Sequence, residues 1–196
     1  MANNLYIALG SNWHRSPRML RLTLEQSLRL FSRESLKIKT SSGWYRSPAF
    51  PAGAGPDFLN GVVAVETDQS AEDALSALHR IEAELGRERK TRWGARTCDL
   101  DLLAYSDIVS PDLPTLRNWI DLPLDRQMKE TPAELILPHP RLQDRAFVLL
   151  PWSEIAPDWR HPVMGQSIAE MLAKLPENAV SDVQKVIDGD TVMAAI

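Results

Sequence analysis

Cysteine is almost absent from this 196-residue chain, which excludes a fold held together by internal disulfides. The only cysteine is Cys98, and a chain so poor in cysteine suits a reducing compartment. Long hydrophobic runs are also missing, since none approaches the roughly 18 apolar residues of a membrane span. The first residues lack the basic and apolar stretches of a signal peptide. We therefore expect a cytoplasmic, monomeric protein that does not enter the membrane.

Positive charge is scarce overall but concentrated in one place. The chain has 22 basic and 26 acidic residues and a net charge of −4. Five of the basic residues lie between Arg87 and Arg96, against the single acid Glu88. A local basic cluster on an acidic protein favours one specific anionic ligand over a general nucleic-acid surface.

Hydrophobic periodicity predicts alternating strands and helices. The expected strands are residues 5–9, 36–44, 61–67 and 98–105, and the expected helices are residues 17–31, 71–85 and 168–175. Up to residue 105 the order is that of a ferredoxin-like βαββαβ core, an antiparallel sheet with helices on one face. We predict one α+β domain over residues 1–196, with a C-terminal extension. Residues 107–137 form a long proline-broken insert, with a short helix near residues 116–120.

A pair of carboxylates on the last predicted strand of the core points to metal chemistry. Asp99 and Asp101 are two positions apart, so both side chains point to the same face of the strand. Leu100, Leu102 and Ala104 then face the core. Two carboxylates at this distance suit a hard cation such as Mg²⁺ bound together with substrate phosphates. The alternative is a pair of solvated acids on an exposed face.

The basic cluster just before this strand strengthens the metal hypothesis. Arginine binds phosphate oxygens through two parallel hydrogen bonds, so several arginines around one loop can hold a polyphosphate. Arginines beside a carboxylate pair are what phosphoryl transfer from a magnesium nucleotide requires. The glycine loops of P-loop enzymes and protein kinases are both missing. A nucleotide would therefore be held by side chains.

Other residues could recognise a flat heterocycle. Phe58 could stack on such a ring, Asn60 could read its hydrogen-bonding edge, and Phe147 could cover its opposite side. The plainer reading is two core phenylalanines and a turn asparagine. His139, held between two prolines, could contact a phosphate. No His/Cys spacing predicts a zinc site.

These pieces together resemble one family, the 6-hydroxymethyl-7,8-dihydropterin pyrophosphokinases, from residue 6 to about residue 158. The matching motifs are residues 6–12, 42–48 with 57–60, 80–82 with 86–87, 92–97 with 99–103, and 138–141 with Arg145 and Phe147. Residues 92–103 are the most specific of them. The resemblance implies transfer of diphosphate from ATP to the pterin hydroxymethyl group, with release of AMP, in folate biosynthesis.

The same resemblance implies roles for individual residues. The catalytic set would be Arg87, Arg89, Arg96, Asp99 and Asp101, of which Asp99 and Asp101 would bind two Mg²⁺ ions. The pterin would contact Ser47, Pro48, Phe50, Phe58, Asn60 and Phe147. ATP would contact Leu75, Glu82, Arg89, Trp93, Arg96, Leu102, His139 and Arg145. The partners would be these two small molecules, with no nucleic acid and no membrane.

Three features depart from the family pattern. Ala95 stands where proline is usual, and Phe58 stands where tyrosine is common. The segment of residues 107–137 is longer than is typical, and we expect it to be peripheral to the site. Two other functions stay open: a module that binds single-stranded nucleic acid, and an inactive homologue with a regulatory role.

Overall fold

The structure, a computed structural model, describes residues 2–49, 53, 55–87, 96–127 and 129–187. The strands are β1 (Asn3–Ser11), β2 (Lys37–Ser41), β3 (Tyr45–Ser47), β4 (Phe58–Thr67), β5 (Asp99–Tyr105) and β6 (Gln184–Lys185). The α-helices are α1 (Pro17–Phe31), α2 (Ala71–Glu84), α3 (Leu113–Ile120), α4 (Leu124–Gln127), α5 (Ala146–Ile155), α6 (Ile168–Leu172) and α7 (Glu177–Ser181). Two 3₁₀ helices, η1 (Ser32–Glu34) and η2 (Leu142–Asp144), complete the set.

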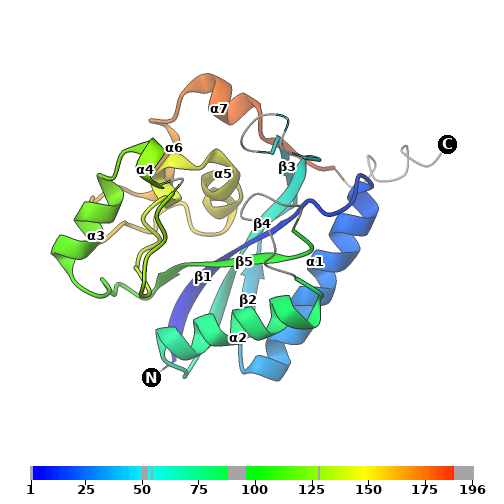
Figure 1. Ribbon diagram of the computed structural model, residues 1–196, viewed down its shortest axis with the longest axis horizontal. Helices are drawn as coiled ribbons and strands as arrows, with labels where there is room; N and C mark the ends of the chain where they lie inside the picture. Colours follow the sequence, from blue (N-terminus) through cyan, green and yellow to red (C-terminus); the bar gives the residue numbers. More distant parts are fainter. Residues whose placement is uncertain (1, 50–52, 54, 88–95, 128, 188–196) are drawn as a thin grey trace.

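One antiparallel sheet forms the centre of the molecule (Figure 1). Its strand order is β5-β1-β4-β3-β6, and β2 also pairs with β4. The long strand β4 pairs with β3 through its first residues and with β2 through its later ones. The strand predicted over residues 36–44 corresponds to β2 and ends earlier, at Ser41, while β3 is a further, unpredicted strand on the same edge of β4. The antiparallel α+β architecture is confirmed.

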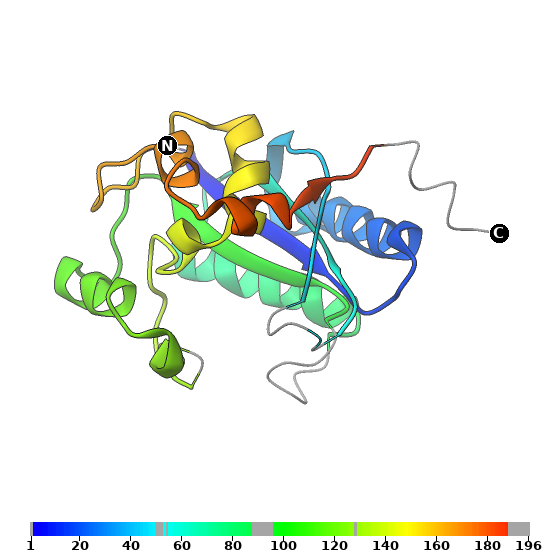
Figure 2. The ribbon, with the colours of Figure 1, turned by 90° about the horizontal axis from the view of Figure 1, so that it is seen from above.

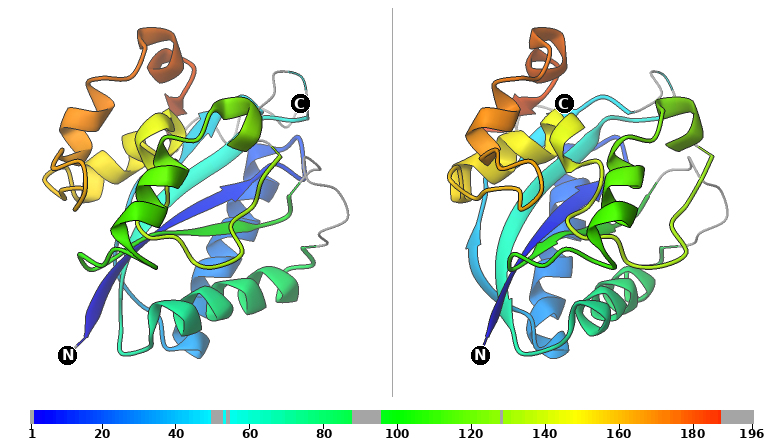
Figure 3. Two further views of the ribbon diagram at one scale, coloured as in Figure 1. Left: turned by 60° about the vertical axis from the view of Figure 1, so that its left-hand side comes forward. Right: turned by 90° about the vertical axis from the view of Figure 1, so that its left-hand side faces the viewer.

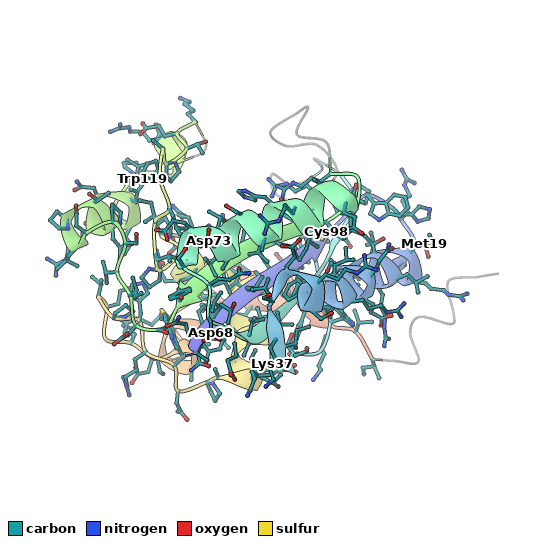
Figure 4. The ribbon with its side chains drawn as sticks, turned by 90° about the horizontal axis from the view of Figure 1, so that it is seen from below. Met19, Lys37, Asp68, Asp73, Cys98 and Trp119 are labelled. Atoms are coloured by element: carbon teal, nitrogen blue, oxygen red, sulfur yellow. The ribbon has the colours of Figure 1, made fainter. Side chains whose placement is uncertain are left out.

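Helices α1 and α2 cover one face of the sheet, as the apolar stripes predict. Leu5, Ile7 and Leu9 of β1 point into this layer and are at most 2% exposed. Cys98 lies in the same apolar cluster, between the sheet and the two helices (Figure 4). Burial raises the pKa of its thiol to about 12. The thiol therefore stays protonated at neutral pH, which agrees with the prediction that Cys98 is not a nucleophile.

The opposite face of the sheet is covered by α5 and α6 (Figure 3), so helices are not confined to one face as predicted. The second core contains Val62 and Ala104 from the sheet, Trp152 from α5 and Ile168 from α6. Helix α5 escaped prediction because it is apolar almost all round and contains Pro151. Such a segment has no polar face to reveal its periodicity.

The predicted alternation along β5 holds only for its first residues. Tyr6 of β1 pairs with Ala104, whereas Ile7 pairs with Leu102, so Leu103 is an extra residue in β5. This bulge reverses the facing of the residues that follow it. Ala104 was predicted to face the same core as Leu100 and Leu102. It lies in the second core instead, so that prediction is wrong.

The insert forms a helical excursion to one side of the sheet (Figure 2). Its helix α3 is close to the predicted position, and Trp119 on that helix lies far from α1 (Figure 4). At the base of the insert, Ser110 and Leu137 exchange two backbone hydrogen bonds of 2.9 and 3.0 Å. Helix α6 ends at Leu172, earlier than the predicted residue 175. Among the described residues, no helix is long and apolar enough to span a membrane.

Candidate active site

Four residues from four neighbouring strands form one row across the sheet. Gly10 of β1 lies opposite Asp99 of β5 and opposite Asn60 of β4. Asn60 in turn lies opposite Tyr45 of β3. Residues directly opposite each other in a sheet share a face. The row therefore places Asp99, the predicted metal ligand, and Asn60, which is predicted to bind the pterin edge, on one face of the sheet. Two strand spacings separate their backbones by about 10 Å.

The missing side chain of Gly10 keeps the middle of this row open. A Cβ atom at position 10 would lie 3.6 Å from Oδ1 of Asn60, 3.7 Å from Cδ1 of Phe58 and 3.9 Å from Cβ of Asp99. Three predicted site residues thus surround one bare backbone position. Glycine allows a ligand to approach the backbone closely here.

Asp99 is the more buried of the two predicted metal ligands. Its carboxylate pairs with the guanidinium groups of Arg87, at 2.6 Å, and Arg96, and the Asp99 side chain is 13% exposed. Burial and the neighbouring charge of Asp101 raise the pKa of Asp99, against the opposing effect of Arg96 and Arg87. The structure therefore brings together four of the five residues predicted to be catalytic.

Asp101 lies on the same face as Asp99 but is more open to solvent, with its side chain 40% exposed. Its carboxylate is 3.7 Å from the guanidinium group of Arg145. That guanidinium also lies over the ring of Phe147, 5.7 Å from the ring centre. Arg145 therefore connects the carboxylate pair to the predicted stacking residue.

Glu82 lies beneath the site, where it supports Arg87. Its buried carboxylate accepts a hydrogen bond of 2.8 Å from the backbone N–H of Leu100 and pairs with Arg87. Glu82 on α2 thus fixes the start of β5 and the direction of the Arg87 side chain. A contact between Glu82 and a nucleotide, implied by the resemblance, stays a prediction.

His139 is held against β5 by its own backbone. Its N–H donates to the carbonyl of Leu103 at 2.8 Å, and its Nδ1 accepts from the N–H of Arg141 at 3.1 Å. Burial, reinforced by the charge of Arg145, lowers the pKa of His139 to about 3. The imidazole is therefore neutral at physiological pH.

The side-chain amide of Asn60 is positioned by β3. It donates to Oγ of Ser47 at 3.0 Å and, at a longer 3.4 Å, to the carbonyl of Tyr45. Ser47 lies opposite Phe58 in the sheet. The structure thus joins Ser47, Phe58 and Asn60, while Pro48 lies exposed at the end of β3.

Two residues that hold the site together, Ser11 and Asn12, were predicted only as part of the family motif over residues 6–12, without a role of their own. Asn12 accepts from the N–H of Arg96 at 2.8 Å and donates to the carbonyl of Pro56 at 3.2 Å. Ser11 donates to the carbonyl of Thr97 at 2.6 Å. Both side chains are buried. The signal that could have indicated them is a pair of polar residues shortly after a predicted buried strand. Polar residues at that place can be buried and bind the backbone of another segment.

Several predicted residues are not placed at the carboxylate pair. Leu102 points into the core on the opposite face from Asp101, and Leu75 packs against the same core. Phe50, Arg89 and Trp93 lie outside the described residues. A cavity of about 710 Å³ shares only Phe58 with the predicted site and is otherwise lined by residues such as Arg15, Arg46 and Lys185. The predicted residues Phe58, Asn60 and Asp99 therefore lie around Gly10, and of these only Phe58 also lines the cavity.

The donor set suits a metal ion that arrives with a phosphate substrate. Within the described ranges, no cluster of three or more His, Cys, Asp or Glu side chains could hold an ion alone. Two carboxylates on one face, Asp99 and Asp101, leave most coordination positions to substrate oxygens and water. Mg²⁺ is usually bound in this way, through one or two carboxylates plus phosphates.

Comparison with known proteins gives the family. The sequence model of the family described as "7,8-dihydro-6-hydroxymethylpterin-pyrophosphokinase (HPPK)" matches residues 6–157. The chain belongs to this family. That span includes β2 to β5, most of β1, and the predicted site residues.

Bacterial relatives of this pyrophosphokinase family are similar over most of the chain. The 2-amino-4-hydroxy-6-hydroxymethyldihydropteridine pyrophosphokinase of Pseudomonas aeruginosa is 36% identical over 90% of this chain and 94% of its own length. The protein of the same name from Synechocystis is 37% identical over 74% of this chain, and the match spans 64% of that relative.

Longer proteins contain a similar region. The folic acid synthesis protein fol1 of Schizosaccharomyces pombe is 30% identical over 97% of this chain, which corresponds to 24% of fol1. A crystal structure of Plasmodium falciparum HPPK-DHPS superposes with a TM-score of 0.65, at 16% identity, over 94% of this chain and 48% of that one. The structural match supports the fold.

Proposed function

We propose that this chain transfers the terminal diphosphate of ATP to the hydroxymethyl group of 6-hydroxymethyl-7,8-dihydropterin and releases AMP, in folate synthesis. Asp99 and Asp101 would hold the two Mg²⁺ ions on which the reaction would depend. Family membership supports the reaction class. The observation that carries the assignment of residues is the row across the sheet, in which Asn60 and Asp99 flank Gly10 on one face.

The pterin would lie over Gly10, between the amide of Asn60 and the carboxylates of β5. Asn60 keeps an acceptor oxygen toward this space, since its N–H₂ group is used by Ser47 and Tyr45. The ring of Phe58 borders the same position. Phe147 would close the pterin from the other side, held by its contact with Arg145. The pterin hydroxyl would then be directed toward the edge of the sheet where β5 lies.

The diphosphate would lie beside the first residues of β5, where arginines from other segments of the chain lie next to Asp99 and Asp101. Arg87 and Arg96 flank Asp99, and Arg145 lies near Asp101. When bound, Mg²⁺ supplies charge neutralisation for the phosphate oxygens. The arginines hold the diphosphate in line with the attacking hydroxyl and stabilise the negative charge that spreads over its oxygens.

Positioning carries most of the catalysis in this proposal. His139 has its Nδ1 engaged by the N–H of Arg141, and its pKa near 3 makes it a poor base. In this proposal the pterin hydroxyl oxygen bonds to the β-phosphorus and its proton passes to solvent. The bond from the β-phosphorus to the oxygen of AMP breaks, and AMP leaves on the opposite side. Holding the two reactants in line can supply a large part of the rate enhancement.

The test is to incubate purified protein with ATP, Mg²⁺ and 6-hydroxymethyl-7,8-dihydropterin and to separate the nucleotides by anion exchange. AMP should form only when the pterin is present. A double variant with Asp99→Ala and Asp101→Ala should form none, and chelation of Mg²⁺ should stop the wild-type reaction. ADP in place of AMP would contradict diphosphate transfer, and no product at all would contradict the enzyme assignment.

A further inference from the structure

A single carboxylate on α5 ties three segments of the chain together behind the predicted pterin site. Oε2 of Glu154 accepts from the backbone N–H of Gly43 at 2.7 Å, just before β3. Oε1 accepts from the phenol of Tyr45 at 2.7 Å and from the ammonium of Lys185 on β6. We name the set of Glu154, Gly43, Tyr45 and Lys185 the Glu154 clasp.

The clasp joins a buried phenol to a partly exposed ion pair. Tyr45 is 7% exposed, whereas the side chains of Glu154 and Lys185 are 24% and 54% exposed. Burial opposes ionisation of Glu154, but the hydrogen bonds from Lys185, Gly43 and Tyr45 outweigh it, so the pKa of the carboxyl lies below its usual range. Burial beside Glu154 raises the pKa of Tyr45, which keeps the phenol protonated as a donor.

Strand β6 completes the clasp from the C-terminal extension, beyond residue 157 where the family match ends. Lys185 lies opposite Tyr45 in the sheet, and the N–H of Val186 donates to the carbonyl of Trp44 at 2.8 Å. A Cβ atom on Gly43 would lie only 2.9 Å from Cε of Lys185, so the segments are in close contact. The short strand β3 is therefore held on one edge by β6 and on the other by β4.

The clasp acts on the site because β3 positions Asn60. Tyr45, the residue that Glu154 holds, is directly opposite Asn60 and offers its carbonyl to the amide of Asn60. Ser47, two residues further along β3, accepts the shorter hydrogen bond from the same amide. A displacement of β3 would therefore rotate the amide and move its oxygen away from the space over Gly10.

We propose that the Glu154 clasp positions Asn60 for pterin recognition, with β6 of the C-terminal extension as a functional part of the site. This inference rests on the proposed function, because it assigns the pterin to Asn60. Glu154 does not touch the substrate in this scheme and is a positioning residue. Its effect belongs to pterin binding and not to ATP binding or to the chemical step.

Steady-state kinetics of Glu154→Ala tests the proposal. We expect the KM for the pterin to rise about tenfold, which corresponds to ~1.4 kcal/mol of binding. The KM for ATP and kcat should each change by less than about threefold, the size of effect expected when only a remote binding contact is lost. Glu154→Gln, which keeps one acceptor oxygen, should recover part of the loss. Equal changes in both KM values, or a fall in kcat alone, would overturn the proposal.

The matched control is Glu66→Gln on β4. Glu66 forms an ion pair of 2.7 Å with Lys39 on the same sheet, away from Asn60, so its loss should leave the pterin KM unchanged. If Glu154→Ala does not fold, Tyr45→Phe removes only one hydroxyl and keeps the buried ring. It should raise the pterin KM about threefold, as expected for one hydrogen bond. An unchanged KM in this variant would overturn the proposal.

Amide hydrogen exchange separates this proposal from the proposed function. Exchange at Ser47 and Asn60 should accelerate in Glu154→Ala but not in Glu66→Gln, whether or not any activity is measured. Protein that forms no AMP with the pterin would refute the function alone. Unchanged exchange at β3 in active protein would refute the clasp alone.

Discussion

Gly10 occupies the position between Asn60 and Asp99 where any side chain would fill the proposed pterin space. A methyl group there would meet three site atoms at 3.6 to 3.9 Å, which is ordinary van der Waals contact. The folded chain can therefore accept alanine at this position. Glycine at position 10 therefore leaves space for the pterin, and the backbone conformation there does not require it.

We predict that Gly10→Ala lowers activity without lowering stability. The free energy of unfolding should stay equal or rise by about 0.5 kcal/mol, because alanine loses less backbone entropy than glycine in a strand. The pterin KM should rise at least about tenfold, a loss of ~1.4 kcal/mol. Urea denaturation and steady-state kinetics measure the two effects.

The control for Gly10 is Gly61→Ala, on the neighbouring strand. There a Cβ atom would lie 2.9 Å from the ring of Trp44. This variant should lose about 1–3 kcal/mol of stability through overpacking. Gly10→Ala losing as much stability as Gly61→Ala would contradict the assignment of Gly10 to the site.

Substitution of Asp99 and of Asp101 should affect activity alike but stability differently. We predict that Asp99→Asn and Asp101→Asn both reduce AMP formation strongly. Asp99→Asn should also destabilise the fold by roughly 2 kcal/mol, because in a mostly buried place it removes the carboxylate that pairs with Arg96 and leaves Arg87 with Glu82. Asp101→Asn should cost less than about 0.5 kcal/mol, since its carboxylate is 40% exposed and its ion pair is long. Equal destabilisation, measured by urea unfolding, would contradict this division.

At the scale of elements, none of the described residues among 112–130 of the insert over residues 107–137 belongs to either apolar core. Its ends are held together by the double hydrogen bond between Ser110 and Leu137. We predict that replacing residues 112–130 with a short Gly-Ser linker leaves kcat and both KM values within about threefold of wild type, because the closed base survives. A folded deletion variant without activity would show that the insert belongs to the site.

The elements with a one-sided apolar pattern could be predicted from the sequence. Helices α1 and α2 and the strands they cover were confirmed, because each buries one face and exposes the other. Helix α5 was not predicted, since it is buried on most sides. The bulge at Leu103 was not predicted either, because the neighbouring strand determines where an extra residue is accommodated.

In the candidate site too, some residues could be predicted from the sequence and others could not. The carboxylate pair Asp99 and Asp101 was found because strand parity alone places both on one face. Local spacing cannot reveal that Asn12 ties Arg96 to Pro56, since these contacts span 84 and 44 positions in the chain. The support of Glu154 for β3 spans 111 positions at Gly43. Groups that support a site from distant segments need the assembled fold to be recognised.

At the scale of the whole molecule, buried histidine links stability to pH. His161 is fully buried, and its Nδ1 accepts from the N–H groups of Val163 and Met164. Burial lowers its pKa to about 4. An unfolded chain would take up a proton near pH 6.5. The stability from neutral His161 is therefore complete above pH 6.5 and is lost as pH falls toward 4.

We predict that the free energy of unfolding is about 2 kcal/mol lower at pH 5 than at pH 7 through this histidine alone. His139, whose pKa is also lowered, acts in the same direction. In His161→Asn, which retains an acceptor for the two N–H groups, the difference between the two pH values should shrink by about that amount. Urea unfolding at pH 5 and pH 7 gives the comparison, and an unchanged difference would contradict it.

The row from Asp99 through Gly10 and Asn60 to Tyr45 has a consequence for how this protein can evolve. Each member is fixed by strand pairing, and no member lies in a connecting loop. A lineage can therefore lengthen or shorten the connections while the row stays in place. One residue gained inside β1 or β4 would instead turn the row to the opposite face. Length differences among descendants should accumulate between the strands, as the insert after β5 illustrates.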